Sequence, residues 1–180
     1  MSQLILTGQR LQLHYLDHDD AGQLRDYLIR NRLHLAPWEP ARDPAYFQLE
    51  QISERIKSNH KLIEAGLACF FTIIYQQQII GVCNYSNLVR GAFQACHLGY
   101  AIDYQFEGKG LMHEALQLSL PYMFEQQGLH RIMANYLPEN QRSGKLLQRL
   151  GFEREGYARR YLRINGEWRD HILTALVAKE

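Results

Sequence analysis

The spacing of apolar and polar residues changes several times along the chain, and each change predicts a new element. Apolar and polar residues alternate over residues 10–15, which is typical of a strand. Helical spacing follows near 18–30 and again over 48–65. Between these helices two prolines bracket an aromatic residue and an acid, so residues 31–40 are expected to form a loop or a broken helix.

The middle of the chain predicts three strands and then a helix. Apolar, strand-like runs cover residues 67–75, 79–88 and 92–102, and short polar turns join them. The spacing then changes to that of a helix over about 109–127. Pro121 lies inside this helix and should kink or shorten it, because proline lacks the N–H that the helix needs.

The last third of the chain predicts one more strand, one more helix and a hairpin. The strand is expected over 130–136 and the helix over 140–150. Two further strands, 157–164 and 167–177, flank Asn-Gly at residues 165–166, which is a strong hairpin signal. The whole order predicts an α/β (α+β) fold with one mixed, mostly antiparallel sheet of about seven strands and helices on both faces.

Composition and charge exclude several classes of protein without indicating a function. The 180 residues suit one domain, with a core expected over about 7–178. The hydrophobic content of 46% and charged content of 22% are ordinary for a soluble globular protein. The net charge of +1 gives no electrostatic argument for nucleic acid. No apolar run suits a membrane span, and no basic-then-apolar start suits a secretory signal.

The cysteines and histidines do not predict a metal or disulfide framework. Cys69, Cys83 and Cys96 are an odd set in strand-like runs, so we expect buried thiols in a reducing compartment, the cytoplasm. A covalent acyl-cysteine is the alternative, although no histidine lies in a nucleophile motif with them. His14 and His18 are four residues apart, but a strand-to-loop boundary separates them, so we expect no metal site.

A glycine pair marks the junction between the strand that ends near 102 and the helix that follows. Gly108 and Gly110 lack the Cβ atoms that would hold a ligand away from the backbone. The first N–H groups of a helix have no intrahelical partner and favour phosphate. The alternative is a purely structural turn. A third glycine for a dinucleotide fingerprint and the Gly-Lys-Ser/Thr of a P-loop are both missing.

Residues 105–110 read Gln-Phe-Glu-Gly-Lys-Gly, which fits the pattern Q/R-x-x-G-x-G/A. This pattern resembles the pyrophosphate-binding motif of the GNAT acetyltransferases, whose ligand is acetyl-coenzyme A. Residues 140–143 resemble the N-x-x-S segment of that family, in which a helix lies beside the pantetheine arm and the thiol. The order of predicted elements is also that of the GNAT fold. The resemblance implies coenzyme contacts from Ile102, Gln105, Gly108, Lys109, Gly110, Leu111, Met112, Asn140 and Ser143.

Four segments narrow the resemblance to the RimJ/RimL type of GNAT enzyme, the N-terminal acetyltransferases of ribosomal proteins. They are residues 34–40, 108–115, 130–136 and 166–171. Among these enzymes the chain is most similar to those that acetylate the N-terminal alanine of ribosomal protein S5. The implied partners are acetyl-coenzyme A and the N-terminus of a ribosomal protein or the ribosome. A small-molecule amine as acceptor, or a GNAT-fold factor that only binds during ribosome assembly, are the alternatives.

The expected chemistry needs a neutral amine, a donor for the departing thiolate and a proton acceptor. Ser143 is the implied thiolate donor, unless Asn140 only caps the helix and Ser143 is solvated. His97 stands where many GNAT enzymes have a glutamate and is the candidate base, with simple packing as the alternative. Backbone N–H groups near Leu98 to Tyr100 are implied to polarise the acetyl carbonyl. A weak base, or a water that relays the proton, suffices for an α-amine, whose pKa of about 7.7–8.0 lies well below that of lysine.

The acceptor is expected to meet aromatic and acidic side chains. Glu39, next to Trp38, is a natural partner for the acceptor ammonium, although a plain loop role is equally open. Tyr100, Tyr161 and Trp168 are expected to line the acceptor side, the last two on the hairpin, where cross-strand packing is the alternative. The related serine-type enzymes carry an acid before this hairpin, whereas residues 159–160 are both arginine here.

Overall fold

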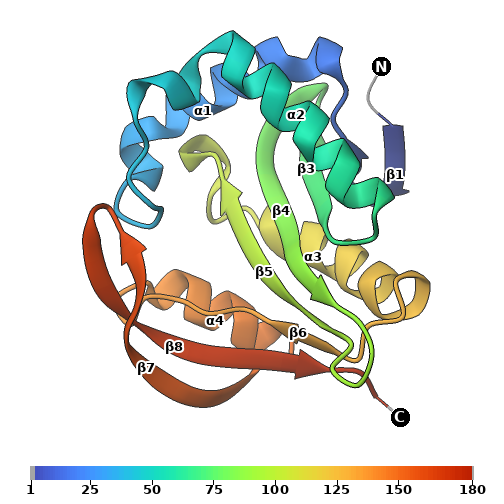
Figure 1. Cartoon of the computed structure of the whole chain (residues 1–180), viewed down its shortest axis with the longest axis vertical. Helices are drawn as coiled ribbons and strands as arrows, with labels where there is room; N and C mark the ends of the chain where they lie inside the picture. Colours follow the sequence, from blue (N-terminus) through green and yellow to red (C-terminus); the bar gives the residue numbers. More distant parts are fainter. Residues whose placement is uncertain (1–2, 180) are drawn as a thin grey trace.

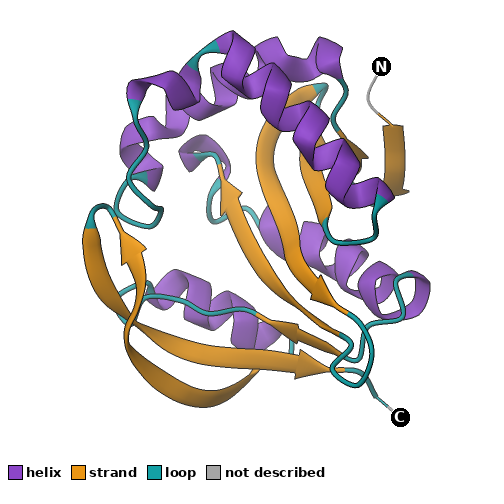
Figure 2. Cartoon of the chain, in the orientation of Figure 1, coloured by secondary structure: helices purple, strands orange, loops and turns teal. Residues whose placement is uncertain are grey.

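One eight-stranded sheet organises the chain, and helices cover both of its faces (Figure 1, Figure 2). The computed structural model describes residues 3–179. The strand order is β1-β2-β3-β4-β5-β6-β8-β7, and within the described residues only the β5–β6 pair is parallel. The strands are β1 (Gln3–Thr7), β2 (Gln12–Tyr15), β3 (Cys69–Tyr75), β4 (Gln78–Val89), β5 (Ala95–Ile102), β6 (Arg131–Met133), β7 (Glu153–Ile164) and β8 (Glu167–Val177).

Within residues 3–179, the four α-helices are accompanied by short 3-10 and π segments. α1 and α2 lie on one face of the sheet, and α3 and α4 lie on the other (Figure 1). The helices are α1 (Ala21–Leu35), α2 (Leu49–Glu64), α3 (Leu111–Pro121) and α4 (Gln141–Arg149), with 3-10 turns at His18–Asp20, Pro44–Phe47 and Tyr104–Phe106 and a π turn at Tyr122–Gln126. The predicted mixed, mostly antiparallel sheet with helices on both faces is confirmed, with β1 as the strand beyond the expected seven.

Two core clusters hold the helices on the sheet. On the α3/α4 face, Leu13 of β2 and Leu116 of α3 are fully buried in the larger cluster. On the other face, Tyr27 of α1, Ile52 of α2 and Ile79 of β4 belong to a smaller cluster. None of the helices in residues 3–179 is long and apolar enough to cross a membrane.

Helix α1 continues to Leu35, so the prediction of a loop or broken helix from residue 31 was wrong for its first five residues. Tyr27, Asn31 and Leu35 follow each other at intervals of four and are all buried, which extends the packed face of the helix by two turns. Asn31 is polar, but its side-chain amide donates to the Tyr27 carbonyl, so its burial leaves this donor satisfied. The helix ends two residues before Pro37.

Helix α3 is shorter than the predicted 109–127 at both ends. It begins at Leu111 because Gly110, with a φ of +75°, lies in the left-handed region. It ends at Pro121, and the chain passes directly into the π turn, so the expected shortening at the proline is confirmed.

Strand β6 is much shorter than the predicted 130–136, and this difference opens the sheet. β5 and β6 pair only between residues 95–97 and 131–133. Beyond Met133 the chain bonds toward β8, since the Ala134 and Tyr136 N–H groups donate to carbonyls of that strand. Within the described residues, positions 98–102 of β5 therefore pair with β4 alone and present an unpaired edge to the gap.

Candidate active site

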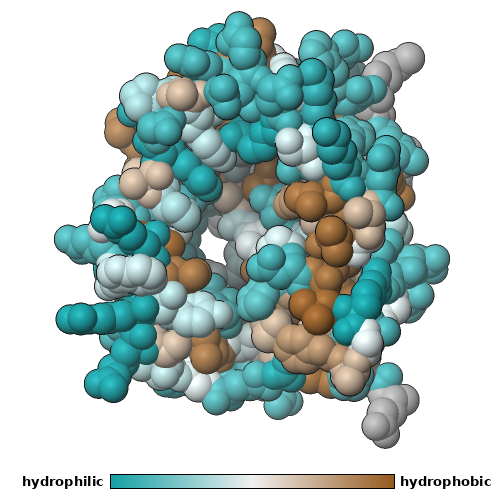
Figure 3. Space-filling view, in the orientation of Figure 1, coloured by the Kyte–Doolittle hydropathy of each residue, from teal (hydrophilic) through white to brown (hydrophobic). Residues whose placement is uncertain are grey.

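A large cleft of about 710 Å³ occupies the gap where β5 and β6 diverge. It opens on the face seen in Figure 3, between the α1 side of the molecule and the β7–β8 hairpin. Its walls come from the end of α1 and the following loop, residues 98–102 of β5, most of the 106–113 turn, residues 135–137 with one side of α4, and His171 of β8. The volume lies within the usual range for a small-molecule site.

One end of the cleft is built from backbone at the start of α3. Gly108 and Gly110 have φ angles of +71° and +75°, and a Cβ on Gly108 would meet nothing within 4 Å. The turn thus leaves open space beside the unpaired N–H groups of Leu111 and Met112 at the helix start. The helix dipole adds a partial positive charge at this place, so the residues present fit a phosphate group.

Arg10 lies beside this turn and is held firmly in place. Its Nε donates to Oε2 of Glu114 at 2.7 Å, and its Nη1 donates to the Lys109 carbonyl at 3.0 Å. Partial burial would raise the pKa of Glu114, but the N–H groups of Arg10 outweigh it and the pKa is lowered. The ionised Glu114 therefore orients a guanidinium whose Nη2 lies 3.5 Å from where a Cβ on Gly110 would stand.

Glu107 joins two helices across the mouth of the cleft. Its carboxylate lies 3.0 Å from His34 Nε2 on α1 and 2.6 Å from Arg142 Nη1 on α4. All three residues line the cleft. An acid beside an anion site is unfavourable alone, and the guanidinium of Arg142 offsets its charge.

The start of α4 presents a hydroxyl pair to the cleft. Asn140 caps the helix, and its Oδ1 accepts from the Ser143 N–H at 3.2 Å. The Ser143 Oγ lies 2.6 Å from the hydroxyl of Tyr100, which reaches across from β5. Burial raises the pKa of Tyr100, so its hydroxyl stays protonated near neutral pH. The pair can therefore donate a hydrogen bond to a group that gains negative charge in the cleft.

Gly144 allows the α4 start to approach the wall of the cleft. A Cβ at this position would stand 2.8 Å from ring atoms of Tyr136, which is closer than real contacts permit. Tyr136 lines the cleft next to Ser143. The glycine is thus explained by packing of the helix start against the tyrosine ring.

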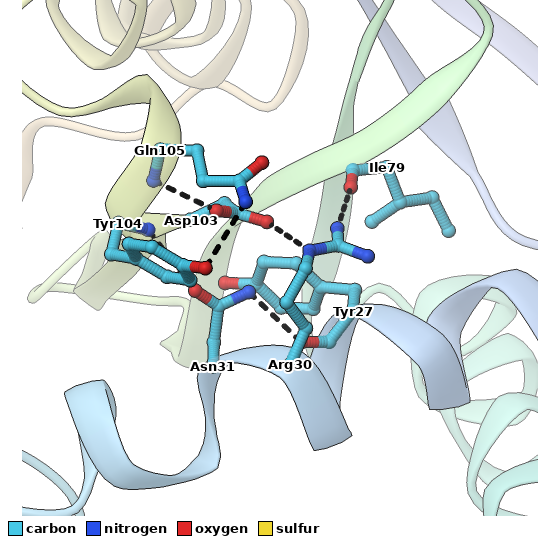
Figure 4. Close-up of polar contacts among 7 residues, drawn as sticks. All are labelled: Tyr27, Arg30, Asn31, Ile79, Asp103, Tyr104 and Gln105. Carbon is cyan, nitrogen blue, oxygen red and sulfur yellow. Dashed lines mark hydrogen bonds and ion pairs between the residues drawn. The ribbon is translucent and has the colours of Figure 1, made fainter.

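The loop before the glycine turn is anchored to α1 by a buried carboxylate, drawn in Figure 4. Asp103 has no exposed surface, and its Oδ2 accepts from Nε of Arg30 at 2.6 Å. Its Oδ1 accepts from the Gln105 N–H at 2.9 Å. Burial alone would raise the pKa of Asp103, but the donors from Gln105, Asn31 and Arg30 lower it.

Asn31 provides a second link between α1 and this loop. Its Oδ1 accepts from the Tyr104 N–H at 3.0 Å, while its amide donates to the Tyr27 carbonyl (Figure 4). Because α1 leads directly into the loop that carries Trp38 and Glu39, the glycine turn and that loop share one support.

The other end of the cleft is closed by a contact between two distant segments. The N–H of Asn165, at the tip of the β7–β8 hairpin, donates to the Glu39 carbonyl at 2.9 Å. Figure 1 shows the hairpin tip meeting the loop after α1. Trp38 and Glu39 both line the cleft here. Burial raises the pKa of the Glu39 carboxyl, while the nearby Arg42 and Arg55 act to lower it.

His171 is a buried imidazole that lines the same cleft from β8. Its Nδ1 lies 3.1 Å from the carbonyl of Arg169. Since a carbonyl can only accept, Nδ1 carries the proton and Nε2 keeps a lone pair. Burial lowers the pKa of His171, so the ring is neutral near pH 7.

A β-bulge on the hairpin explains how Tyr161 comes to lie beside His171. Ala158 pairs with His171 and Leu162 pairs with Arg169, so two extra residues are accommodated on β7. The rings of Tyr161 and His171 are 5.5 Å apart. The Tyr161 hydroxyl also accepts from the side-chain amide of Asn135 at 3.3 Å.

The predicted site residues divide into two groups. Those that line the cleft are Trp38, Glu39, Tyr100, Ile102, Gly108, Gly110, Leu111, Met112, Asn140 and Ser143. Those outside its lining are His97, Gln105, Lys109, Tyr161 and Trp168. His97 is half-buried on β5, and its Nδ1 has no hydrogen-bond partner among the described residues. Trp168 is 62% exposed on the hairpin.

Several residues of the site were not singled out from the sequence, namely Arg10, Arg30, Asn31, Asp103, Glu107, Asn135, Arg142 and His171. A polar residue inside or at the end of an apolar run, such as Asp103, was the one available signal. The expectation of buried thiols is confirmed, because all three cysteines are buried. Burial raises the pKa of each thiol, which disfavours an acyl-cysteine.

Comparison with known proteins agrees with the motifs and with the phosphate-type turn in the cleft. The sequence matches the family described as Acetyltransferase (GNAT) domain over residues 10–153. It is 48% identical over 177 residues to the ribosomal protein uS5-alanine N-acetyltransferase of Escherichia coli (strain K12), covering 97% of this chain and 91% of that protein.

Two solved structures have the same fold over nearly the whole chain. Ribosomal-protein-S5-alanine acetyltransferase from Vibrio fischeri superposes with a TM-score of 0.93 at 41% identity, covering 100% of this chain and 98% of that one. RimJ from Mycobacterium smegmatis, in complex with CoA-disulfide, superposes with a TM-score of 0.89 at 29% identity, covering 93% and 82%. The resemblance inferred from the two motifs is thereby confirmed, and the chain belongs to the GNAT acetyltransferase family.

Proposed function

We propose that this protein transfers the acetyl group of acetyl-coenzyme A to the N-terminal α-amine of a ribosomal protein, specifically the N-terminal alanine of S5, in the cytoplasm. The names of relatives that are 48% and 41% identical support this acceptor. The observation that carries the proposal is the single cleft with a phosphate-type backbone turn at one end and the Trp38–Glu39 loop and His171 at the other.

Acetyl-coenzyme A supplies an activated thioester. The N–H groups at Leu111 and Met112, together with Arg10, are proposed to hold its pyrophosphate. Arg149 also lines the cleft and adds positive charge. The unpaired edge of β5 at residues 98–102 offers backbone donors and acceptors to amide groups, as in strand addition.

The hydroxyl pair of Ser143 and Tyr100 is proposed to donate to the departing thiolate. Both side chains line the cleft where the strands diverge, 2.6 Å from each other. Tyr100 was expected on the acceptor side from the sequence. Its contact with Ser143 supports a role on the thiol side instead, because the two hydroxyls act as one donor unit.

Glu39 is proposed to hold the acceptor ammonium, and His171 to take its proton. The Glu39 carboxylate lies at the closed end of the cleft, and His171 presents a neutral Nε2. We favour His171 over His97 because His171 lines the cleft and has a fixed tautomer. An α-amine with a pKa of about 7.7–8.0 needs only such a weak base.

Mass spectrometry of synthetic peptides tests the acceptor. Each peptide begins with alanine and contains one internal lysine, and a matched set carries a formyl-blocked N-terminus. We expect one acetyl group on the free α-amine and none on the blocked peptides. Acetylation that persists on blocked peptides would place the modification on lysine, and faster transfer to a free polyamine would indicate a small-molecule acceptor.

A further inference from the structure

A second, small cavity of about 270 Å³ lies between α1, α2 and the sheet strands β3 and β4. Glu39 lines both this small cavity and the large cleft, so the two lie on either side of one residue at the acceptor end. The side chains around the small cavity that matter here are Tyr27, Arg42, Tyr46 and Arg55. No step of the proposed reaction uses any of these four.

Two guanidinium groups stack on one tyrosine ring in the small cavity. The Arg42 and Arg55 Cζ atoms lie 4.3 and 4.1 Å from the centroid of Tyr46. The nearest carboxylate to Arg42 is Glu39, at a loose 3.8 Å. Within residues 3–179, Arg55 has no hydrogen bond and no carboxylate in ion-pair range, although it is half-buried. The cavity lining thus has an excess of positive charge, and the Arg55 guanidinium has no protein acceptor among the described residues.

The hydroxyl of Tyr27 is a further donor without an acceptor in the lining of the same cavity. Tyr27 is only 1% exposed, and its hydroxyl has no hydrogen-bond partner among the described residues. In Figure 4 the backbone carbonyl of Tyr27 accepts from Asn31, whereas no contact joins its hydroxyl. Buried hydroxyls are nearly always satisfied, so an orphan donor on a cavity wall is a place for an accepting group, supplied by water or by a ligand.

We propose that the small cavity is a specificity subsite for the acceptor, in which Arg55, Arg42 and the Tyr27 hydroxyl bind a side-chain carboxylate close to the N-terminus of the peptide. This inference rests on the proposed function. The planar guanidinium fork matches a carboxylate geometrically, and the stacking on Tyr46 fixes its orientation. The α-ammonium of the peptide neutralises Glu39, so Arg42 and Arg55 are free to bind the side-chain carboxylate of the peptide.

The test uses alanine-initiated peptides with glutamate at position 2, 3 or 4, each compared with the glutamine peptide of the same sequence. At one of these positions, we expect the glutamate peptide to have a kcat/KM about tenfold higher, the gain of one charge-assisted hydrogen bond over a neutral one. Equal kcat/KM for glutamate and glutamine at all three positions would overturn the subsite. If no peptide is acetylated on its α-amine, the proposed function itself fails, which is a different result.

Two variants assign the preference to the small cavity. Arg55→Gln should reduce the glutamate-to-glutamine ratio to nearly one, and Tyr27→Phe, which removes only the hydroxyl, should reduce it severalfold. Arg154→Gln removes an exposed arginine of β7 outside the cavity and should keep the wild-type ratio. Since the readout is a ratio within one variant, partial loss of folded protein cancels. A preference that survives Arg55→Gln unchanged would place the carboxylate elsewhere.

Discussion

The two ends of the large cleft are built in different ways. The coenzyme end comes from one continuous stretch, residues 102–112, with the start of α4 beside it. The acceptor end is assembled from the loop after α1, residues 135–137 of the chain after β6, and His171 of β8. A contact between the Asn165 N–H and the Glu39 carbonyl closes it.

The difference lies in what recognises the ligand. At the coenzyme end most of the proposed donors are backbone N–H groups, whose geometry depends on glycine at fixed spacing, and Arg10 adds one side-chain donor. At the acceptor end the groups are side chains brought together by the tertiary fold. The coenzyme end should therefore respond to changes in local backbone, and the acceptor end to changes in single functional groups.

The largest effect is expected from Gly110→Asp. The substitution puts an L-residue at a φ of +75° and a carboxylate where phosphate must approach. Loss of about two charge-assisted hydrogen bonds predicts at least a roughly 100-fold weaker affinity for acetyl-coenzyme A. Isothermal titration calorimetry measures it.

Gly128→Asp is the matched control for backbone strain. Gly128 has a φ of +62°, has open space around it, and lies outside the cleft. The Gly128→Asp variant should be less stable than the wild type but should bind acetyl-coenzyme A with the same affinity. If both variants bind equally poorly, strain rather than the phosphate site explains the loss.

The same difference between local and tertiary construction explains which parts of the fold and of the site could be predicted from the sequence. The glycine turn, the Asn140 cap and the hairpin turn were predictable because each depends on residues close in the chain. The opening of the sheet was not, because β6 stops pairing with β5 at Met133 for reasons of tertiary packing. His171 could not be distinguished from other strand histidines, since only the tertiary fold brings this part of β8 to the wall of the cleft.

At the acceptor end, His171→Asn should have the next largest effect. Asparagine keeps a donor for the Arg169 carbonyl but removes the Nε2 lone pair. Loss of a general base predicts a kcat about 100-fold lower at saturating peptide. His97→Asn is the matched substitution outside the cleft lining and should change kcat little. If instead His97→Asn lowers kcat about 100-fold and His171→Asn changes kcat little, His97 is the base.

The pH dependence sharpens this assignment. The pKa of His171 is lowered by burial, and only the neutral ring accepts a proton. The advantage of the wild type over His171→Asn should therefore be full above pH about 6.5 and shrink as the pH falls through the lowered pKa. An advantage that does not shrink at any acidic pH at which both proteins stay folded would contradict a base role.

Asp103→Asn should have the smallest effect and tests whether the two ends are coupled. The carboxylate is fully buried and joins Arg30 of α1 to the Gln105 N–H of the loop before the glycine turn (Figure 4). Asparagine keeps the shape but leaves the 27%-exposed Arg30 with a neutral partner. We expect the free energy of unfolding in urea to fall by about 2 kcal/mol, less than for a fully buried pair, and coenzyme affinity to weaken severalfold.

Asp26→Asn, on the exposed side of α1, is the control and should change neither the free energy of unfolding nor the coenzyme affinity.

The pKa of Asp103 is lowered in the folded protein. The stabilising contribution of Asp103 is therefore full above the unfolded-state pKa of about 3.9, and it is lost as the pH falls through the folded-state pKa. The stability difference between wild type and Asp103→Asn should therefore shrink only in strong acid. If stability falls while coenzyme affinity stays at the wild-type value, Asp103 supports the fold alone. Any coupling between the loop after α1 and the glycine turn would then depend on the Asn31–Tyr104 and His34–Glu107 contacts, which the substitution leaves in place.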